Sequence, residues 1–81
     1  MIKVRFFANL RDLAGCETAQ VDLAGVTAAR LREALAEQFP ALAQALGSPS
    51  VKLAVNQEFA GDDTVIADGD EVALLPPFSG G

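Results

Sequence analysis

One stretch of the chain, residues 25–40, has the apolar period of an amphipathic helix, and strand-like alternation lies on both sides of it. Thr27 suits the N-cap because its hydroxyl can accept a hydrogen bond from a free backbone N–H. Val26 and Leu31 are spaced as a hydrophobic staple. Pro40 ends the helix because proline lacks an N–H and clashes with the preceding turn. One long helix among several strands predicts an α+β fold, with the helix packed on one face of a sheet.

Four segments alternate between apolar and polar residues and are expected to form strands: residues 2–8, 18–23, 51–56 and 65–75. Residues 56–63 add a turn, a very short strand and a loop. Residues 9–17 are expected to form a connection with a turn at Gly15, so that the first two strands make a hairpin with a long loop. Residues 41–47 add a short helical turn closed by Gly47. The sequence therefore predicts a mixed sheet of about five strands.

Length and charge limit the possible functions. The chain has 81 residues, 51% of them hydrophobic, which is enough for one domain; we expect a folded domain over residues 1–75 and an extended tail over residues 76–81. The net charge of −5 argues against nucleic-acid and anionic-membrane partners. No apolar run approaches the roughly 20 residues of a membrane span, and the N-terminus lacks the features of a signal peptide. A cytoplasmic location is expected.

Side chains suited to catalysis or metal binding are scarce. The chain has no histidine and one cysteine, which removes the commonest general base and excludes an internal disulfide or a multi-cysteine metal site. Cys16 is expected to be an incidental loop thiol, because a nucleophile needs an activating environment and Arg11 is its only nearby cation. The acidic stretches 61–63 and 68–71 lack EF-hand spacing and are expected to be solvated turns. We therefore expect no bound cofactor and no metal.

The alternation places large apolar side chains on the face of the sheet opposite the helix. Phe7 and Leu75 belong to this open face, and Phe59 follows a turn from which it could join them. Phe7 could instead cap the far edge of a small core. Three large apolar residues on one open face favour a partner-binding patch. The acidic residues from Glu58 to Glu71 would add electrostatic steering.

The segment "PPFSGG", residues 76–81, ends the sequence on glycine. Gly80 and Gly81 would let the backbone enter a channel too narrow for a Cβ, and Pro76-Pro77 favours a stiff, extended departure from the sheet. A carboxylate is a poor electrophile, and the chain has no nucleotide-binding loop with which to activate it. A second, ATP-using protein is therefore expected to activate Gly81. The alternative is a frayed terminus without a function.

Several short motifs together resemble one known family: "FFA" after Lys3-Val4, "AVNQ" at residues 54–57, "DGDEVA" at residues 68–73, and the terminal "PP" and "GG". Over essentially the whole chain they resemble the small subunit of molybdopterin synthase, the sulfur carrier of molybdenum cofactor biosynthesis. The resemblance implies a β-grasp, ubiquitin-like fold.

The resemblance also implies a mechanism and partners. An E1-like adenylyltransferase would use ATP to adenylate Gly81, and a sulfur donor system would convert the acyl-adenylate to a thiocarboxylate. The tail would then deliver sulfur to cyclic pyranopterin monophosphate in the large subunit of molybdopterin synthase, which supplies the catalytic side chains in a heterotetramer. The family's apolar contact positions fall on Phe7, Phe59 and Leu75, and the tail residues Pro76, Pro77 and Phe78 are also expected to contact the partner.

Two alternatives remain open from the sequence. The chain could carry sulfur for another pathway, such as thiamin synthesis or tRNA thiolation, with the same chemistry at Gly81. It could instead be a ubiquitin-like modifier or a plain adaptor, whose tail forms an amide or does nothing.

Overall fold

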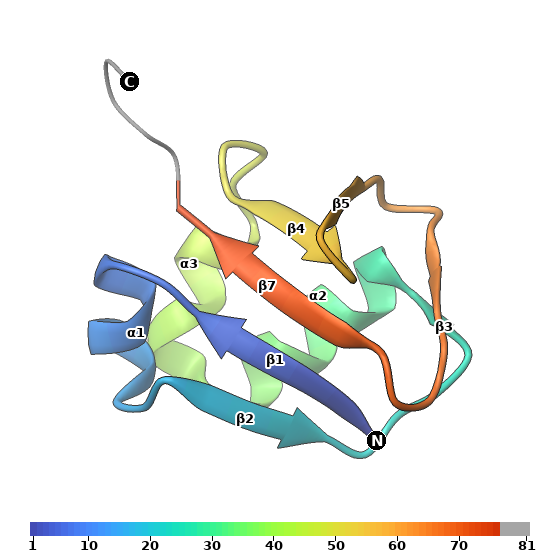
Figure 1. The fold of residues 1–81 in the computed structure, drawn as a ribbon. Coiled ribbons are helices and arrows are strands. Elements are labelled where there is room, and N and C mark those ends of the chain that lie inside the picture. Colours follow the sequence, from blue (N-terminus) through green and yellow to red (C-terminus); the bar gives the residue numbers. More distant parts are fainter. Residues whose placement is uncertain (77–81) are drawn as a thin grey trace.

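The computed structural model describes residues 1–76 and has a five-stranded sheet, a small two-stranded sheet and helices on one side (Figure 1). In chain order the elements are β1 (Ile2–Phe6), α1 (Asn9–Ala14), β2 (Thr18–Val21), β3 (Val26–Thr27), α2 (Ala28–Gln38), the 3₁₀ turn η1 (Pro40–Leu42), α3 (Ala43–Leu46), β4 (Lys52–Val55), β5 (Glu58–Ala60), β6 (Val65–Ile66) and β7 (Glu71–Leu75).

The large sheet has the strand order β2-β1-β7-β4-β5, so the first and last strands of the domain lie side by side at its centre. β1 and β7 are parallel, with Val4 opposite Val72, and the remaining pairs are antiparallel. The sheet is therefore mixed, as predicted. β3 and β6 form a separate antiparallel pair at the side of the molecule.

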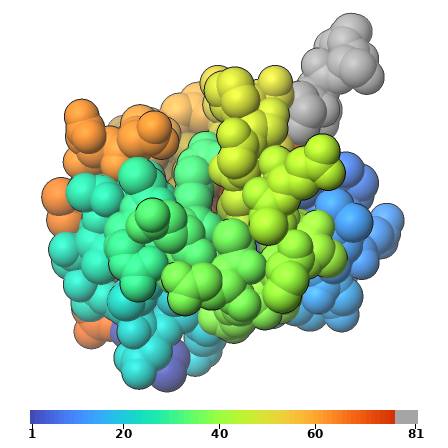
Figure 2. Space-filling view, turned by 180° about the vertical axis from the view of Figure 1, so that it is seen from behind, coloured from blue at the N-terminus to red at the C-terminus, as the bar shows by residue number. Residues whose placement is uncertain are grey.

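The core lies between the large sheet and the helices. Alternate residues of β1 and β7, such as Val4 and Leu74, point toward α2, from which Leu31 and Leu35 are fully buried. Figure 1 looks onto the open face with the helices behind the sheet, and Figure 2, from the opposite side, shows the green helical segments covering that back. The α+β, β-grasp expectation is confirmed: one main helix crosses one face, and among residues 1–76 no helix lies over the other face.

The local sequence signals at Thr27 and Pro40 predicted both ends of α2 correctly. Thr27 is its N-cap and accepts a hydrogen bond from the backbone N–H of Arg30 at 3.2 Å. The helix ends at Gln38, and Pro40 begins η1. The short helical turn before Gly47 is also present, as α3.

The connection between the first two strands differs from the prediction, because residues 9–14 form the helix α1. Leu10 is its buried residue, and Gly15 caps its C-terminus in the left-handed conformation, with φ of 79°. A helix of 6 residues is too short to show a helical period in the sequence. It is stabilised by packing against the core.

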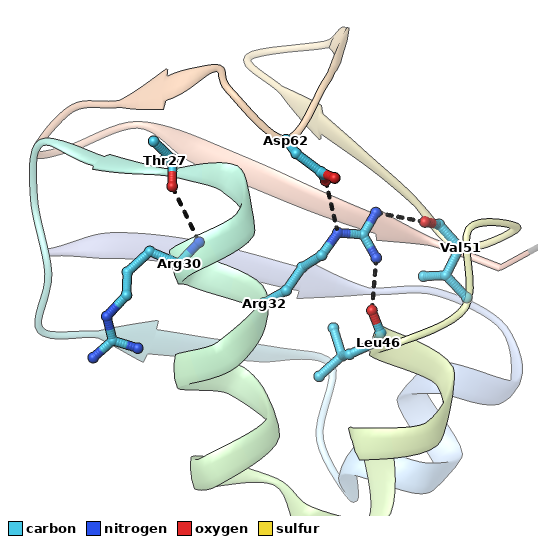
Figure 3. A network of polar contacts seen from close by, with 6 residues as sticks. All are labelled: Thr27, Arg30, Arg32, Leu46, Val51 and Asp62. Carbon is cyan, nitrogen blue, oxygen red and sulfur yellow. Dashed lines mark hydrogen bonds and ion pairs between the residues drawn. The ribbon is translucent and has the colours of Figure 1, made fainter.

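Arg32 of α2 contacts three other segments of the chain: the end of α3, the segment before β4 and the loop after β5 (Figure 3). Its guanidinium donates to the backbone carbonyl of Leu46 at 2.9 Å and to that of Val51 at 2.6 Å. Its Nε lies 3.9 Å from a carboxylate oxygen of Asp62. The side chain is 18% exposed, so a charged group of α2 fixes the end of α3 and the approach to β4. Within residues 1–76, no helix has the length and apolar character needed to cross a membrane.

Candidate functional site

The open face of the large sheet is the surface on which the predicted partner-binding residues lie. The strand register sets Arg5 beside Ala73, Ala73 beside Ala54, and Ala54 beside Phe59. Ala54 is buried although it is outside the core cluster. Two small residues thus form the middle of the face, and larger side chains stand around them.

Phe7 follows the last residue of β1 and is 41% exposed. The next residue, Ala8, has φ of 52°, a conformation that a non-glycine residue rarely adopts. The backbone N–H groups of Leu10 and Arg11 donate to the carbonyls of Phe7 and Ala8, at 3.1 Å each. This tight turn holds Phe7 at the surface while Phe6, on the other side of β1, is 3% exposed. The structure therefore does not bury Phe7 in the core.

Phe59 is the most exposed of the three predicted patch residues, at 78%. It lies in the middle of β5, one of the two edge strands of the large sheet. With Lys52, Ala60 and Gly61 it lines a surface depression of about 350 Å³. An aromatic side chain this exposed adds little to the stability of the free domain, and exposed apolar surface of this kind is typical of an interface.

Leu75 ends β7, lies opposite Lys52 in the register and is half-buried. Because Phe6 is opposite Leu74 in the parallel pair, Phe7 and Leu75 leave the sheet at the same end. Phe59 lies on β5, with β4 between it and β7. The three residues share the open face, but Phe59 is separated from the other two by β4, which places Lys52 and Ala54 between them.

Pro76, which the sequence analysis assigned to the tail, is buried. The tail residues Pro77, Phe78, Gly80 and Gly81 lie outside the described residues. The last described residue comes directly after β7, a central strand that is hydrogen-bonded on both sides. The point from which residues 77–81 continue is therefore fixed by the sheet.

Two of the motifs that carry the family resemblance, "AVNQ" and "DGDEVA", lie in contact, which the sequence did not predict. Asn56 of "AVNQ" donates from its side-chain amide to a carboxylate oxygen of Asp70 in "DGDEVA", at 3.1 Å. Its amide oxygen accepts from the N–H of Glu71 at 3.1 Å, and its own N–H donates to the carbonyl of Glu71 at 2.8 Å. The other Asp70 oxygen accepts from the N–H of Ala67 at 2.9 Å. These contacts fix the β4–β5 turn against the start of β7.

The N-terminus is held by the loop that precedes β7. The ammonium group of Met1 donates a hydrogen bond to the carboxylate of Asp68, and this bond, with the positive charge itself, holds the pKa of that carboxyl below its usual value. The N–H of Gly69 donates to the carbonyl of Met1 at 2.8 Å. The first residue of the sequence is thus joined to the loop that leads into β7.

Cys16 is half-buried after α1, and its thiol donates to the carbonyl of Ala14 at 3.9 Å. Arg11, the nearby cation, faces Glu17 at 3.5 Å. Among residues 1–76, no three of the His, Cys, Asp and Glu side chains gather closely enough to hold a metal ion. Within residues 1–76, the feature that stands out is therefore the exposed apolar side chains on the open face.

This fold and this surface are those of a small ubiquitin-like β-grasp protein. A sequence model of the ThiS family matches residues 4–81, and the chain belongs to that family.

Three comparisons describe its relatives. The molybdopterin synthase sulfur carrier subunit of Escherichia coli (strain K12) is 42% identical over 81 residues, with 100% of both chains covered. The crystal structure of SAMP1 from Haloferax volcanii superposes with a TM-score of 0.89 at 32% identity, covering 99% of this chain and 98% of that one. One chain of the complex of subunits 1 and 2 of molybdopterin-converting factor from Helicobacter pylori superposes with a TM-score of 0.68 at 26% identity, covering 99% and 97%.

Proposed function

We propose that this chain is the sulfur carrier subunit of molybdopterin synthase and that the C-terminal carbonyl of Gly81 carries the sulfur. The observation that carries the proposal is full-length likeness: the Escherichia coli sulfur carrier subunit aligns over the whole of both chains, and the family match extends to residue 81. The scarcity of catalytic side chains agrees with a carrier, since a carrier needs only a folded domain, a docking surface and a reactive C-terminal carboxylate.

The chemistry at Gly81 proceeds in two substitutions. In the first, a carboxylate oxygen attacks the α-phosphorus of ATP on an E1-like partner, and pyrophosphate leaves. In the second, the outer sulfur of a persulfide donor attacks the acyl-adenylate carbon and AMP leaves. A thiol then attacks the donor's inner sulfur in the resulting acyl disulfide, which forms a disulfide with the donor and releases the thiocarboxylate. The large subunit then receives the tail, and sulfur passes to cyclic pyranopterin monophosphate. In this scheme the carrier needs no cofactor of its own, because ATP is used by the activating partner.

Docking of the body positions the tail. We propose that Phe7, Phe59 and Leu75 contact the large subunit, and that Pro76, Pro77 and Phe78 direct Gly80 and Gly81 into its active site. The Helicobacter pylori complex of subunits 1 and 2 supports a paired assembly. An exposed aromatic such as Phe59 is the kind of side chain that anchors interfaces.

Intact-mass spectrometry of the chain purified from cells that contain the pathway tests the proposal. We expect a species in which one oxygen is replaced by sulfur. A chain extended beyond Gly81, or lacking it, should show no such species, and Cys16→Ser should show it at the normal level because the sulfur is carried on the terminal carbonyl. Loss of the thiolated species in Cys16→Ser, or full activity of an untrimmed extended chain, would refute the assignment of Gly81.

A second candidate rests on one observation, the likeness to SAMP1, which is named the small archaeal modifier protein 1. A modifier would form lysine-linked adducts through Gly81. The same mass measurement distinguishes the two candidates, because adducts on other proteins appear in place of, or beside, the thiolated free chain. Sulfur transfer by the thiolated chain, reconstituted with the large subunit and cyclic pyranopterin monophosphate, decides among sulfur pathways.

A further inference from the structure

Charged side chains are distributed unevenly around the large sheet. The strands place three exposed cations on the open face, Lys3 and Arg5 from β1 and Lys52 from β4. Within residues 1–76, Glu71 is the one carboxylate that the five strands place there. The chain as a whole has a net charge of −5. An acidic protein therefore presents a docking face with a local excess of positive charge.

The cations on this face differ in what they contact. Arg5 lies 3.5 Å from the carboxylate of Glu71, and Lys3 is next to Glu71 in the register. Neither lysine has a carboxylate within ion-pair distance among the described residues, but Lys52, unlike Lys3, also has no carboxylate next to it in the register. Its strand neighbour across β7 is Leu75.

Lys52 also forms one wall of the depression beside Phe59. A partner that covers Phe59 and Leu75 would therefore remove water from this ammonium group as well. Burying a charge without a partner is costly, so a stable complex must provide an opposite charge or a set of acceptors at that point.

Resting on the proposed function, in which this face docks on the large subunit, we propose that the open face fits a partner surface whose apolar centre is flanked by carboxylates, one of which pairs with Lys52. The ammonium group accounts for specificity more than for affinity, because a misdocked partner would leave it unpaired.

The acidic loops of the chain offer the opposite arrangement, in which a basic partner surface would contact residues between Glu58 and Glu71. Several of these carboxylates already have partners within the chain. Asp62 faces Arg32, Asp68 accepts from the N-terminal ammonium, and Asp70 accepts from the side chain of Asn56. Lys52, on the open face itself, has no such partner among residues 1–76.

The test measures binding to the purified large subunit of molybdopterin synthase from the same organism, as affinity and association rate at low and high salt. The variants are Lys52→Gln and Lys52→Glu. Arg30→Glu is the matched control, because it changes the net charge as much as Lys52→Glu does but lies on α2, away from the open face. Asp63→Asn tests the acidic loop, and Phe59→Ala tests the docking face. Thermal melting checks that each variant is folded.

We expect Lys52→Glu to weaken binding about tenfold or more at low salt, and Lys52→Gln to weaken it less and to reduce its salt dependence. Arg30→Glu and Asp63→Asn should stay within about twofold of the wild type. Wild-type affinity in both Lys52 variants, or a larger loss of salt dependence in Asp63→Asn than in Lys52→Gln, overturns the charge assignment. If the charge assignment fails but Phe59→Ala weakens binding, the open face is still the docking face, and only the role of Lys52 is refuted. If Phe59→Ala and both Lys52 variants all bind normally, the docking face of the proposed function fails as well.

Discussion

The side-chain amide of Asn56 donates to the carboxylate of Asp70 at 3.1 Å, across a separation of 14 residues in the chain. The bond joins the β4–β5 turn to the loop before β7. Both residues lie in motifs that carry the family resemblance, and the contacts described for them are structural hydrogen bonds. Their role is to fix the position of β7, the strand that leads to the tail.

Removing this contact should destabilise the domain. Asn56→Ala loses the side-chain bonds to Asp70 and to the N–H of Glu71, and it places alanine at φ of 50°. We expect a loss of about 1–2 kcal/mol in the free energy of unfolding, measured by urea denaturation. Asp70→Ala should cost a similar amount, and the double variant less than the sum, because both single changes break the same bond. Strict additivity would show that the two residues act independently.

Gln57 offers a stabilising change at the same turn. It follows Asn56 in a two-residue hairpin connection and has φ of 73°, and positive φ at both central residues is the geometry in which Asn-Gly is preferred. Gln57→Gly should raise the free energy of unfolding by about 0.5–1 kcal/mol, as the relief of strain exceeds the added entropy of the unfolded chain. Gly61→Ala, in the loop after β5, provides a contrast without positive φ. A lower melting temperature for Gln57→Gly would contradict the turn geometry.

Arg32 should contribute to the stability of the domain, and lysine at this position should replace only part of its contribution. Its guanidinium satisfies the carbonyls of Leu46 and Val51 at once, and a single ammonium group lacks that forked geometry. Arg32→Met should lower the free energy of unfolding by about 2–3 kcal/mol, since two carbonyls lose their donor. Arg32→Lys should recover part of this loss. Arg30→Met, on the exposed side of α2, is the control and should change stability by less than about 0.5 kcal/mol. Equal effects at both positions would show that the bonds to the two carbonyls add nothing.

The two faces of the sheet can be compared with a pair of aromatic substitutions. Phe6 is 3% exposed, and its ring contacts that of Phe39 edge to face, with centroids 5.3 Å apart. Phe6→Ala should cost about 3–5 kcal/mol of stability. Phe59→Ala should cost less than about 1 kcal/mol in the free domain, because its side chain is 78% exposed. As an interface anchor, however, Phe59 should contribute about 2 kcal/mol or more to binding the large subunit. A large loss of stability in Phe59→Ala without a change in binding would assign it to the core.

The contact between Met1 and Asp68 gives the domain one acid-sensitive interaction. Because the folded pKa of Asp68 lies below its unfolded value, the stabilisation is fully present above about pH 4 and is lost as the pH falls through the folded pKa. Asp68→Asn should therefore lower the melting temperature by at most a few degrees near neutral pH, an effect limited by solvent exposure. The difference from the wild type should vanish toward pH 2. A constant difference across this range would mean that the carboxylate charge plays no part.

The sequence by itself determined the features that depend on neighbouring residues. The ends of α2 follow from Thr27 and Pro40, whose effects on the backbone act within one helical turn. Strand alternation placed Phe7 and Leu75 opposite the helix, because side chains of a strand point alternately to its two faces; Phe59 was expected to join them from the turn before it. The α+β class and the mixed sheet followed from the same local patterns.

The tertiary structure decided what depends on residues distant in the chain. Residues 9–14 form a helix because Leu10 packs into a core that a window of neighbouring residues cannot describe. The parallel pairing of β1 with β7 brings the two ends of the domain together, and it places Phe7 near Leu75 while leaving Phe59 on the far edge. The Asn56–Asp70 bond and the place of Lys52 beside Leu75 likewise exist only once the strands are paired, since each depends on side chains that the register, and not the local sequence, sets side by side.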